Sequence, residues 1–149
     1  GITMRPGKRW SIDAALGYTF DKIGTSDHQG YVYSITGGWK PTAKLNLQAS
    51  FQRQRTVDIE GQPYTKELYE LALNYLPRKR LALNSSIKYY DYRYQDSHTK
   101  RIDFRLNANY RLNKWASISL SYIRNQNVGM PAEDEARSNR ISAGINLHY

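Results

Sequence analysis

The chain has 149 residues, 40% of them hydrophobic, and its 22 Lys and Arg against 13 Asp and Glu give a net charge of +9. It contains no cysteine, which excludes disulfides and thiolate metal sites, and it lacks the run of about 18 apolar residues that a membrane-spanning helix needs. The mean hydropathy of −0.75 suggests a soluble protein, but this average is blind to strands that show only alternate residues to lipid.

Eight segments alternate apolar and polar residues with a period of two, which predicts β-strands with two unlike faces. "RIDFRLNANYRL" is the clearest of them, and no stretch has a convincing helical period. In chain order the segments are residues 8–20, 30–39, 45–54, 66–75, 81–94, 101–112, 116–122 and 141–149. The sequence therefore predicts an all-β chain.

The connections between these segments alternate between short and long. "KPTAK", "LPRKR" and "LNKW" are tight turns, whereas "DKIGTSDHQG" and "NQNVGMPAEDEARS" are polar loops. Pro6, Pro41, Pro77 and Leu112 occupy matching turn positions at intervals of 35, 36 and 35 residues. A hairpin plus a loop is thus the repeating unit, and it predicts an antiparallel up-and-down sheet with all short turns at one end.

Three features favour a membrane barrel over a soluble barrel or sandwich. The polar face is mostly Ser, Asn, Gln, Gly and Thr, as expected of a lumen rather than a face in open water. Short turns at one end and long loops at the other match periplasmic turns and extracellular loops. Aromatic residues cluster at both ends of the apolar face, which predicts two membrane girdles. The girdle residues are Trp10, Trp39, Tyr75, Tyr110 and Tyr149 by the short turns, and Tyr18, Tyr31, Tyr69, Tyr89 and Tyr122 toward the loops.

We therefore expect an antiparallel up-and-down transmembrane β-barrel of about eight strands in the outer membrane of a Gram-negative bacterium, with residues 1–149 as one domain. Residues 1–7 resemble the end of a preceding strand, which favours the C-terminal part of a larger barrel; the alternative is a periplasmic tail. The final "ISAGINLHY" resembles the C-terminal signal by which the barrel assembly machinery recognises outer-membrane proteins. Tyr149 departs from the more usual terminal Phe.

The repeat also carries a family resemblance. An apolar or aromatic residue, Pro, basic residues and then "LNLQAS" or "LALNSS" is similar to the β-barrel porins encoded with bacterial exopolysaccharide synthesis genes. The seventh segment departs from this pattern, with Leu112 where Pro would stand. The resemblance implies a role in moving polysaccharide across the outer membrane and implies no catalytic residue.

Basic residues exceed acidic ones on the predicted inner face. The lumen-facing basic residues are Arg9, Lys66, Lys88, Arg101, Arg105, Arg111 and Arg140. A cationic wall would favour anions such as uronate-bearing sugar chains. The alternative is that several pair across strands in a packed interior, as Arg101, Asp103 and Arg105 suggest. Tyr90, Tyr92 and Tyr94 share this face, where they could stack on sugar rings or simply fill the mouth.

A second basic group falls on the outward face just beyond the apolar band. Arg53, Arg55, Arg93 and Arg124 are expected to contact lipopolysaccharide phosphates, with solvated surface charge as the alternative. Outer-membrane lipid and lipopolysaccharide are therefore predicted partners. We expect no nucleic-acid binding despite the net charge, because the basic residues are dispersed over two rims and a lumen rather than collected in one stripe.

The sequence predicts no catalytic, cofactor-binding or metal-binding residue. His28, His98 and His148 are too scattered for a metal site, and "DSHT" places Ser and His in one loop without an evident third partner. The predicted function is a pore or export conduit for anionic polysaccharide. A closed eight-stranded barrel with a structural or surface-recognition role is the alternative, and a hydrolase at the barrel rim is a third class.

Overall fold

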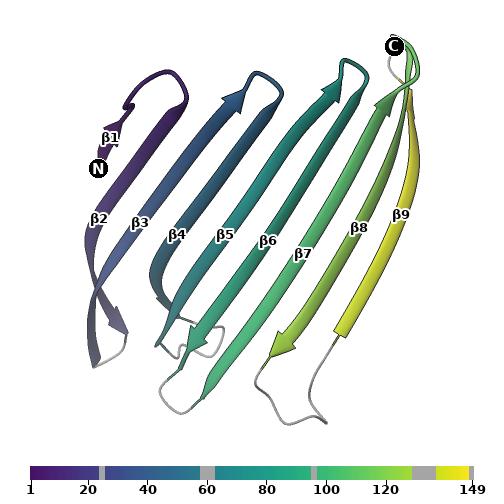
Figure 1. The fold of residues 1–149 in the computed structure, drawn as a ribbon. Coiled ribbons are helices and arrows are strands. Elements are labelled where there is room, and N and C mark those ends of the chain that lie inside the picture. Colours follow the sequence, from purple (N-terminus) through teal and green to yellow (C-terminus); the bar gives the residue numbers. More distant parts are fainter. Residues whose placement is uncertain (24–25, 58–62, 95–96, 129–136, 148–149) are drawn as a thin grey trace.

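The computed structural model describes residues 1–23, 26–57, 63–94, 97–128 and 137–147. In this part of the chain nine strands form one antiparallel sheet, and every strand pairs with its sequence neighbours (Figure 1). The strands are β1 (Ile2–Met4), β2 (Trp10–Ile23), β3 (Ser26–Thr42), β4 (Leu45–Val57), β5 (Pro63–Arg78), β6 (Leu81–Arg93), β7 (His98–Arg111), β8 (Ala116–Val128) and β9 (Arg137–Leu147).

Within the described residues all eight predicted segments are confirmed as strands, and the up-and-down order is confirmed as well. The ninth, β1, pairs with the middle of β2 through Ile2↔Ala14 and Met4↔Ile12. No helix in the described residues is long and apolar enough to cross a membrane. Whether β1 continues a larger barrel stays a prediction.

The predicted loop at 21–30 is wrong over most of its length. The β2–β3 ladder continues through Asp21↔His28 and Lys22↔Asp27 as far as Ile23↔Ser26. Alternation in the sequence reports where one face stops being apolar, whereas backbone hydrogen bonding can continue beyond that point in water. Several strands are therefore longer than the roughly 9–11 residues that a tilted bilayer crossing needs.

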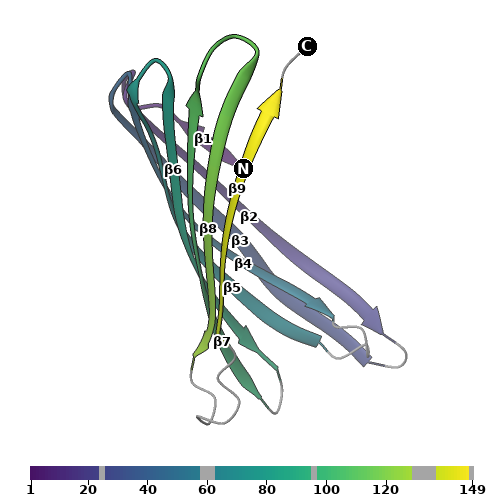
Figure 2. The same cartoon turned by 90° about the vertical axis from the view of Figure 1, so that its right-hand side faces the viewer.

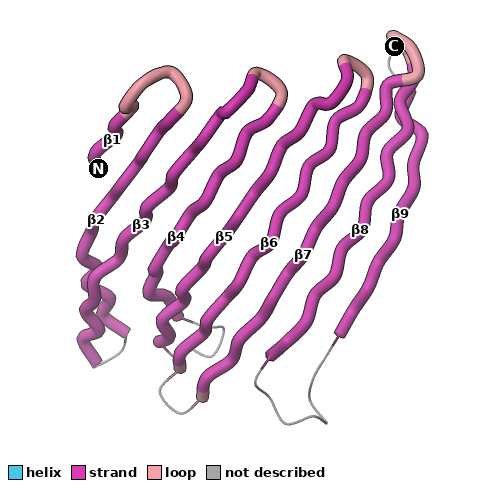
Figure 3. Tube along the Cα trace, in the orientation of Figure 1, coloured by secondary structure: helices cyan, strands magenta, loops and turns pink. Residues whose placement is uncertain are grey.

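Four connections gather at one end of the sheet (Figure 3), at residues 5–9, 43–44, 79–80 and 112–115. Gly7 has a φ of +95°, which glycine adopts without steric cost. In the last of these turns the side-chain oxygen of Asn113 accepts hydrogen bonds from the backbone N–H groups of Trp115 and Ala116, both at 2.8 Å. An Asn side chain thus closes this turn where the other repeats carry proline.

The sheet is a single twisted layer without a hydrophobic core in its described residues. Figure 2 shows the twist, with β2 and β9 running in clearly different directions. β1 and β9 are the two edges and do not pair with each other. No hydrophobic side chain among the described residues is buried, and Leu16 and Ile141 are each 75% exposed. The aliphatic residues predicted for the apolar face therefore lie on an uncovered surface of the sheet.

Candidate functional site

The strand register assigns each residue to one of two faces, because directly paired residues point to the same side. The polar face includes the row Gln48, Ala72, Ser86, Arg105, Ile123 and Arg140, one residue from each of β4–β9. The apolar face includes the row Leu45, Tyr75, Leu83, Ala108, Leu120 and Ala143 from the same strands. The two predicted parities thus stay separate across the sheet.

Two of the predicted lumen-facing cations are paired on the polar face. Lys88 Nζ lies 3.2 Å from Glu70 Oε1, its direct cross-strand partner. Arg101 donates twice to Asp103, from Nε to Oδ1 at 2.7 Å and from Nη2 to Oδ2 at 3.1 Å. The Asn125 amide, oriented to satisfy its hydrogen bonds, also donates to Asp103 Oδ1 at 3.1 Å. Asp103 is 3% exposed, so it is a buried anion held by three donors.

Three more of the predicted lumen-facing cations, Arg105, Arg111 and Arg140, lie on the same face. Arg105 and Arg140 both face Ile123 from the two sides of β8, and Arg111 faces Ser117. No ion pair joins these three arginines to another described residue, and all three are exposed. Their positive charge is therefore uncompensated by any described carboxylate.

A cluster of tyrosines lies on the same face toward the loop end. We call Tyr64, Lys66, Tyr90, Tyr92 and Tyr94 the tyrosine cluster. Tyr64 stacks on Tyr94 with ring centroids 4.8 Å apart, and Tyr90 stacks on Tyr92 at 5.8 Å. Lys66 Nζ lies 5.3 Å and 5.9 Å from the centroids of Tyr90 and Tyr92, a cation–π arrangement. Tyr64 was not predicted as a member of this group, although it lies on the same face of β5 as Lys66.

Rings on the apolar face form a belt on its loop side, in three groups of contacting residues. Tyr18 meets Tyr31 edge-on at 4.9 Å, Tyr33 meets Phe51 at 5.3 Å, and Phe51 stacks on Tyr69 at 4.5 Å. Tyr69 contacts Tyr89 at 5.9 Å, and Phe104 contacts Tyr122 at 6.1 Å. The loop-side belt thus consists of Tyr18, Tyr31, Tyr33, Phe51, Tyr69, Tyr89, Phe104 and Tyr122.

This belt runs obliquely to the strand ladder. One ladder row passes through Trp10, Trp39, Leu47, Leu73, Ser85, Leu106 and Tyr122. The belt lies on this row at Tyr122 in β8, but at Tyr18 in β2 it is eight residues away from Trp10. Eight residues of about 3.3 Å against six strand spacings of about 4.8 Å correspond to an angle of about 40°. Strands of a membrane barrel tilt by a similar angle, so the belt follows a plane across tilted strands.

A second belt, the turn-side belt, consists of Trp10, Trp39, Tyr75 and Tyr110. It is oblique to the ladder rows in the same direction as the loop-side belt. Trp10 stacks on Trp39 at 5.3 Å, and Tyr75 and Tyr110 lie progressively closer to the turns than the Trp10 ladder row. Six residues separate Tyr69 from Tyr75 on β5, and six separate Phe104 from Tyr110 on β7. The two belts are therefore parallel over these strands. Tyr149 lies outside the described residues.

Beyond the loop-side belt the apolar face becomes charged. We call Arg53, Glu67, Asp91, Arg93 and His98 the rim cluster. Arg93 Nη2 lies 3.3 Å from Glu67 Oε2 and 3.1 Å from Asp91 Oδ2, while Arg53 Nη1 lies 3.9 Å from Glu67 Oε1. His98 Nε2 pairs with Asp91 Oδ1, and Tyr69 of the belt donates to Glu67 Oε2 at 3.4 Å.

Of the four arginines predicted to meet lipopolysaccharide, the structure joins two. Arg53 and Arg93 share the Glu67 carboxylate. Arg124 donates to Gln126 at 3.2 Å, two strands away from Arg93. The Arg55 side chain packs against β3 at Gly30. A Cβ added to Gly30 would lie only 3.1 Å from Arg55 Cδ. All four lie two or four residues beyond the belt residue of their own strand, Phe51, Tyr89 or Tyr122. Glu67 and Asp91 were not predicted as site residues, because their convergence on Arg93 depends on the strand register.

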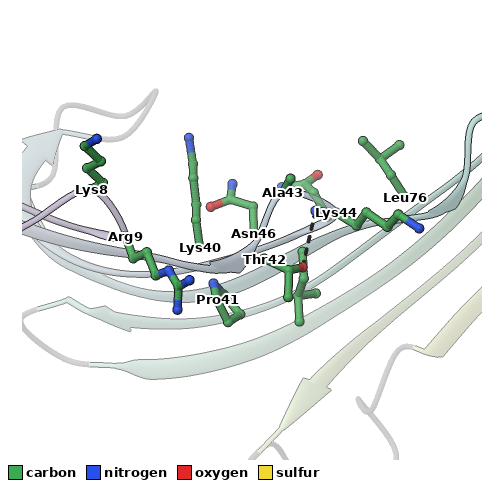
Figure 4. Close-up of a pocket in the computed structure, with 11 residues that line it drawn as sticks. Lys8, Arg9, Lys40, Pro41, Thr42, Ala43, Lys44, Asn46 and Leu76 are labelled. Carbon is green, nitrogen blue, oxygen red and sulfur yellow. Dashed lines mark hydrogen bonds between the residues drawn. The ribbon is translucent and has the colours of Figure 1, made fainter.

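A hollow of about 450 Å³ lies at the turn end, around the β3–β4 turn, with residues of the β1–β2 turn and of β5 beside it (Figure 4). Lys8, Arg9, Lys40 and Lys44 line it, and Figure 4 shows Lys40 and Asn46 on one side of the strands. The guanidinium of Arg9 extends to the opposite side, where Pro41 lies. Arg9 precedes β2, and its carbonyl accepts the Lys40 N–H at 2.8 Å. The hollow is a basic surface, and Arg9 lies apart from the other predicted lumen-facing cations.

No group of three or more His, Asp or Glu in the described residues is arranged to hold a metal ion. His28 belongs to β3 and His98 to the rim cluster, while His148 lies outside the described residues.

Comparison with known proteins identifies the fold. The model of the family "Putative beta-barrel porin 2" matches residues 1–149. Among solved structures, the chain resembles "OmpT (in-vitro folded), an outer membrane protein of Vibrio cholerae", with a TM-score of 0.61 and 13% sequence identity. This match covers 93% of the chain and 50% of the Vibrio protein, so the chain spans about half the length of that structure. No curated protein matches the chain.

The chain therefore belongs to the "Putative beta-barrel porin 2" family. Its fold is that of an antiparallel transmembrane β-barrel of the bacterial outer membrane, as the sequence predicted.

Proposed function

We propose that this barrel is a passive pore or export conduit for an anionic polysaccharide, with the polar face lining its lumen. In a membrane barrel the apolar face meets lipid, so the polar face turns toward the axis. The observation that carries the proposal is the positive charge of Arg105, Arg111 and Arg140 on that face, which no carboxylate of the described residues pairs with. Guanidinium groups bind carboxylates and phosphates, the anionic groups of acidic sugar chains.

The tyrosine cluster supports the sugar part of this proposal. Its rings lie on the polar face near the loop end, where a chain would enter or leave the lumen. Aromatic rings offer flat apolar surfaces that suit the C–H faces of pyranose sugars, and Lys66 adds a cation beside them. A uronate residue presents both features, an apolar ring face and a carboxylate. We infer that the tyrosine cluster contacts the sugar chain at the mouth.

Planar-bilayer recording of the purified protein tests the proposal. We expect a stable current with anion over cation selectivity, and partial block by oligogalacturonate added on either side. The charge reversal Arg105→Glu with Arg140→Glu should invert the selectivity and abolish the block. Arg78→Gln in the turn end is the control, since it removes a positive charge outside the lumen and should leave selectivity unchanged. The same anion over cation selectivity in the wild type and in the charge-reversed variant would contradict the proposal.

A closed barrel with a structural or surface-recognition role is the second candidate. The observation that favours it is the packing on the polar face, where Asp103 is buried beneath Arg101 and Asn125. Such contacts are expected in a small barrel whose interior is filled by side chains. Absence of any stable current from folded protein, together with retained folding, would favour this candidate over the pore.

We also infer that the barrel has no catalytic role. His98 and Asp91 form a pair of the kind that hydrolases use, but the described residues place no hydroxyl group within hydrogen-bond distance of His98. Without a hydroxyl group beside the base, hydrolysis through a covalent acyl-enzyme lacks its nucleophile. Phospholipid and lipopolysaccharide deacylation should therefore be absent from wild type and from His98→Ala alike. Activity that disappears in His98→Ala would refute this inference.

A further inference from the structure

We propose that the rim cluster is a binding site for a phosphorylated outer-leaflet lipid, whose phosphate contacts Arg93 and Arg53 while an acyl chain lies on the apolar face below. The proposal concerns the outer surface of the barrel and does not depend on what passes through its lumen.

The first argument is the arrangement of charge by depth. The carboxylate residues Glu67 and Asp91 are 7% and 6% exposed. The side chains of Arg93 and His98, which they hold, are 53% and 48% exposed. The two carboxylates therefore lie underneath and the Arg93 guanidinium on top, so an approaching molecule meets a cationic group. Lys100 adds to it, because it is the cross-strand partner of Asp91 on β7.

The second argument is the hydrogen-bonding capacity that remains. Both contacts of Arg93 with described carboxylates use Nη2, which leaves its Nη1 and Nε hydrogens for an outside acceptor. Arg53 approaches Glu67 only to 3.9 Å, a distance at which its fork is not committed to a direct hydrogen bond. Phosphate oxygens are the acceptors that such planar donors match in pairs. The carboxylates thus position the guanidinium groups without using all their donors.

The third argument is the position of the rim cluster relative to the membrane. Glu67 and Asp91 lie two residues beyond Tyr69 and Tyr89 of the loop-side belt, or about 7 Å along the strand. Belts of this kind lie at the level of lipid headgroups, and in outer-membrane barrels the long loops face the outside. The rim cluster is therefore expected at the level of the outer-leaflet phosphates.

The fourth argument is an apolar trough directly below. A shallow hollow of about 530 Å³ on the apolar face runs between β3 and β6, bounded by Tyr69 and Tyr89. Gly37 and Ala49, which pair with each other, form part of its floor. Small side chains between larger ones leave a groove that suits an acyl chain. A cationic rim above an apolar trough is complementary to a phospholipid or lipid A molecule, which has anionic phosphate above apolar acyl chains.

The test uses a variant that removes a cation together with its buried partner. Asp91→Asn combined with Arg93→Gln leaves no buried carboxylate at position 91, and Glu67 keeps Arg53 at 3.9 Å and the Tyr69 hydroxyl at 3.4 Å, so the barrel should still fold. Binding of diphosphoryl lipid A to the purified protein in detergent is measured by native mass spectrometry. We expect its affinity to fall about tenfold or more, the effect of losing a charge-assisted hydrogen bond. Unchanged affinity in the folded double variant would overturn the proposal.

Two controls fix the site and the ligand. Glu70→Gln with Lys88→Gln removes an ion pair across the same two strands on the opposite face, and lipid A affinity should stay at the wild-type value. Lipid A stripped of both phosphates should bind the wild type as weakly as diphosphoryl lipid A binds the double variant. Equal loss in the control pair, or equal binding of the dephosphorylated lipid, would refute a phosphate site. Displacement of lipid A by millimolar inorganic phosphate would instead assign the cluster to a soluble anion and overturn the lipid proposal.

Discussion

The two faces of the sheet share one backbone ladder but hold their side chains in different ways. On the polar face the described contacts are directional, such as the Arg101–Asp103 fork and the Lys88–Glu70 pair. On the apolar face between the belts, Leu71 and Leu120 are about half exposed and meet no covering layer. Side chains on the polar face are therefore held by contacts within the protein, whereas those on the apolar face must be covered by lipid.

The largest expected change in unfolding free energy distinguishes two neighbouring residues on β5. Leu71 lies on the apolar face opposite Ala49 and Ile87, and Ala72 lies on the polar face opposite Gln48 and Ser86. Leu71→Arg should cost about 2–4 kcal/mol of unfolding free energy in a bilayer, because a guanidinium would enter the hydrocarbon layer. Ala72→Arg should cost less than about 1 kcal/mol, since its charge stays in a polar surrounding.

Reversible urea unfolding in phospholipid vesicles measures both variants. Equal costs for Leu71→Arg and Ala72→Arg would mean that the two faces do not meet different media. The membrane orientation of the sheet would then be wrong.

A smaller effect is expected on the polar face at Asp103. Asp103→Asn removes the negative charge and one of the two oxygens that accept hydrogen bonds from the Arg101 fork. The Arg101 side chain is 41% exposed and can be partly hydrated, so we expect a loss near the low end of the usual range, about 1 kcal/mol. The double variant Arg101→Gln with Asp103→Asn should recover part of that loss, as a double-mutant cycle would show. A double variant less stable than Asp103→Asn would contradict this account of the pair.

These contrasts also show what the sequence could predict. Period-two alternation assigns every strand residue to a face, and this alone identified the strands, the polar wall and the aromatic positions. It cannot report how far one strand is shifted against the next. The oblique course of the loop-side belt, the convergence of Glu67 and Asp91 on Arg93, and the place of Tyr64 beside Tyr94 all depend on that shift.

Loop boundaries were the weakest part of the prediction for a related reason. A polar stretch such as residues 21–30 can be a loop or the water-exposed end of a hairpin, and hydropathy does not distinguish them. The ladder from Asp21↔His28 to Ile23↔Ser26 shows the second case. Burial patterns mark the bilayer, while backbone pairing marks the strand, and the two limits need not coincide.

A change in unfolding free energy similar to that at Asp103 is expected within the loop-side belt. Phe51 and Tyr69 stack with centroids 4.5 Å apart and an interplanar angle of 25°. Tyr69→Leu keeps an apolar side chain but removes the stack, and should cost about 0.5–1.5 kcal/mol. Tyr69→Phe retains the ring and loses only the 3.4 Å contact to Glu67, so it should cost clearly less. Both are measured by vesicle unfolding, and equal costs would show that the hydroxyl rather than the ring stabilises this position.

The smallest effect contrasts two adjacent glycines of β3 on opposite faces. A Cβ at Gly37, on the apolar face, would come no closer than 4.0 Å to the Ala49 carbonyl oxygen, whereas a Cβ at Gly38, on the polar face, would lie 2.6 Å from Ser11 Oγ. Gly37→Ala should stabilise the barrel by about 0.4–1 kcal/mol by restricting the unfolded chain. Gly38→Ala should lose that gain, because the Ser11 hydroxyl must leave its position at a cost of about 0.5–1.5 kcal/mol. Combining Gly38→Ala with Ser11→Ala removes the close contact and should restore the gain in the same unfolding assay. If Gly38→Ala alone stabilised the barrel as much as Gly37→Ala, the contact with Ser11 would not restrict side chains at this position of the polar face.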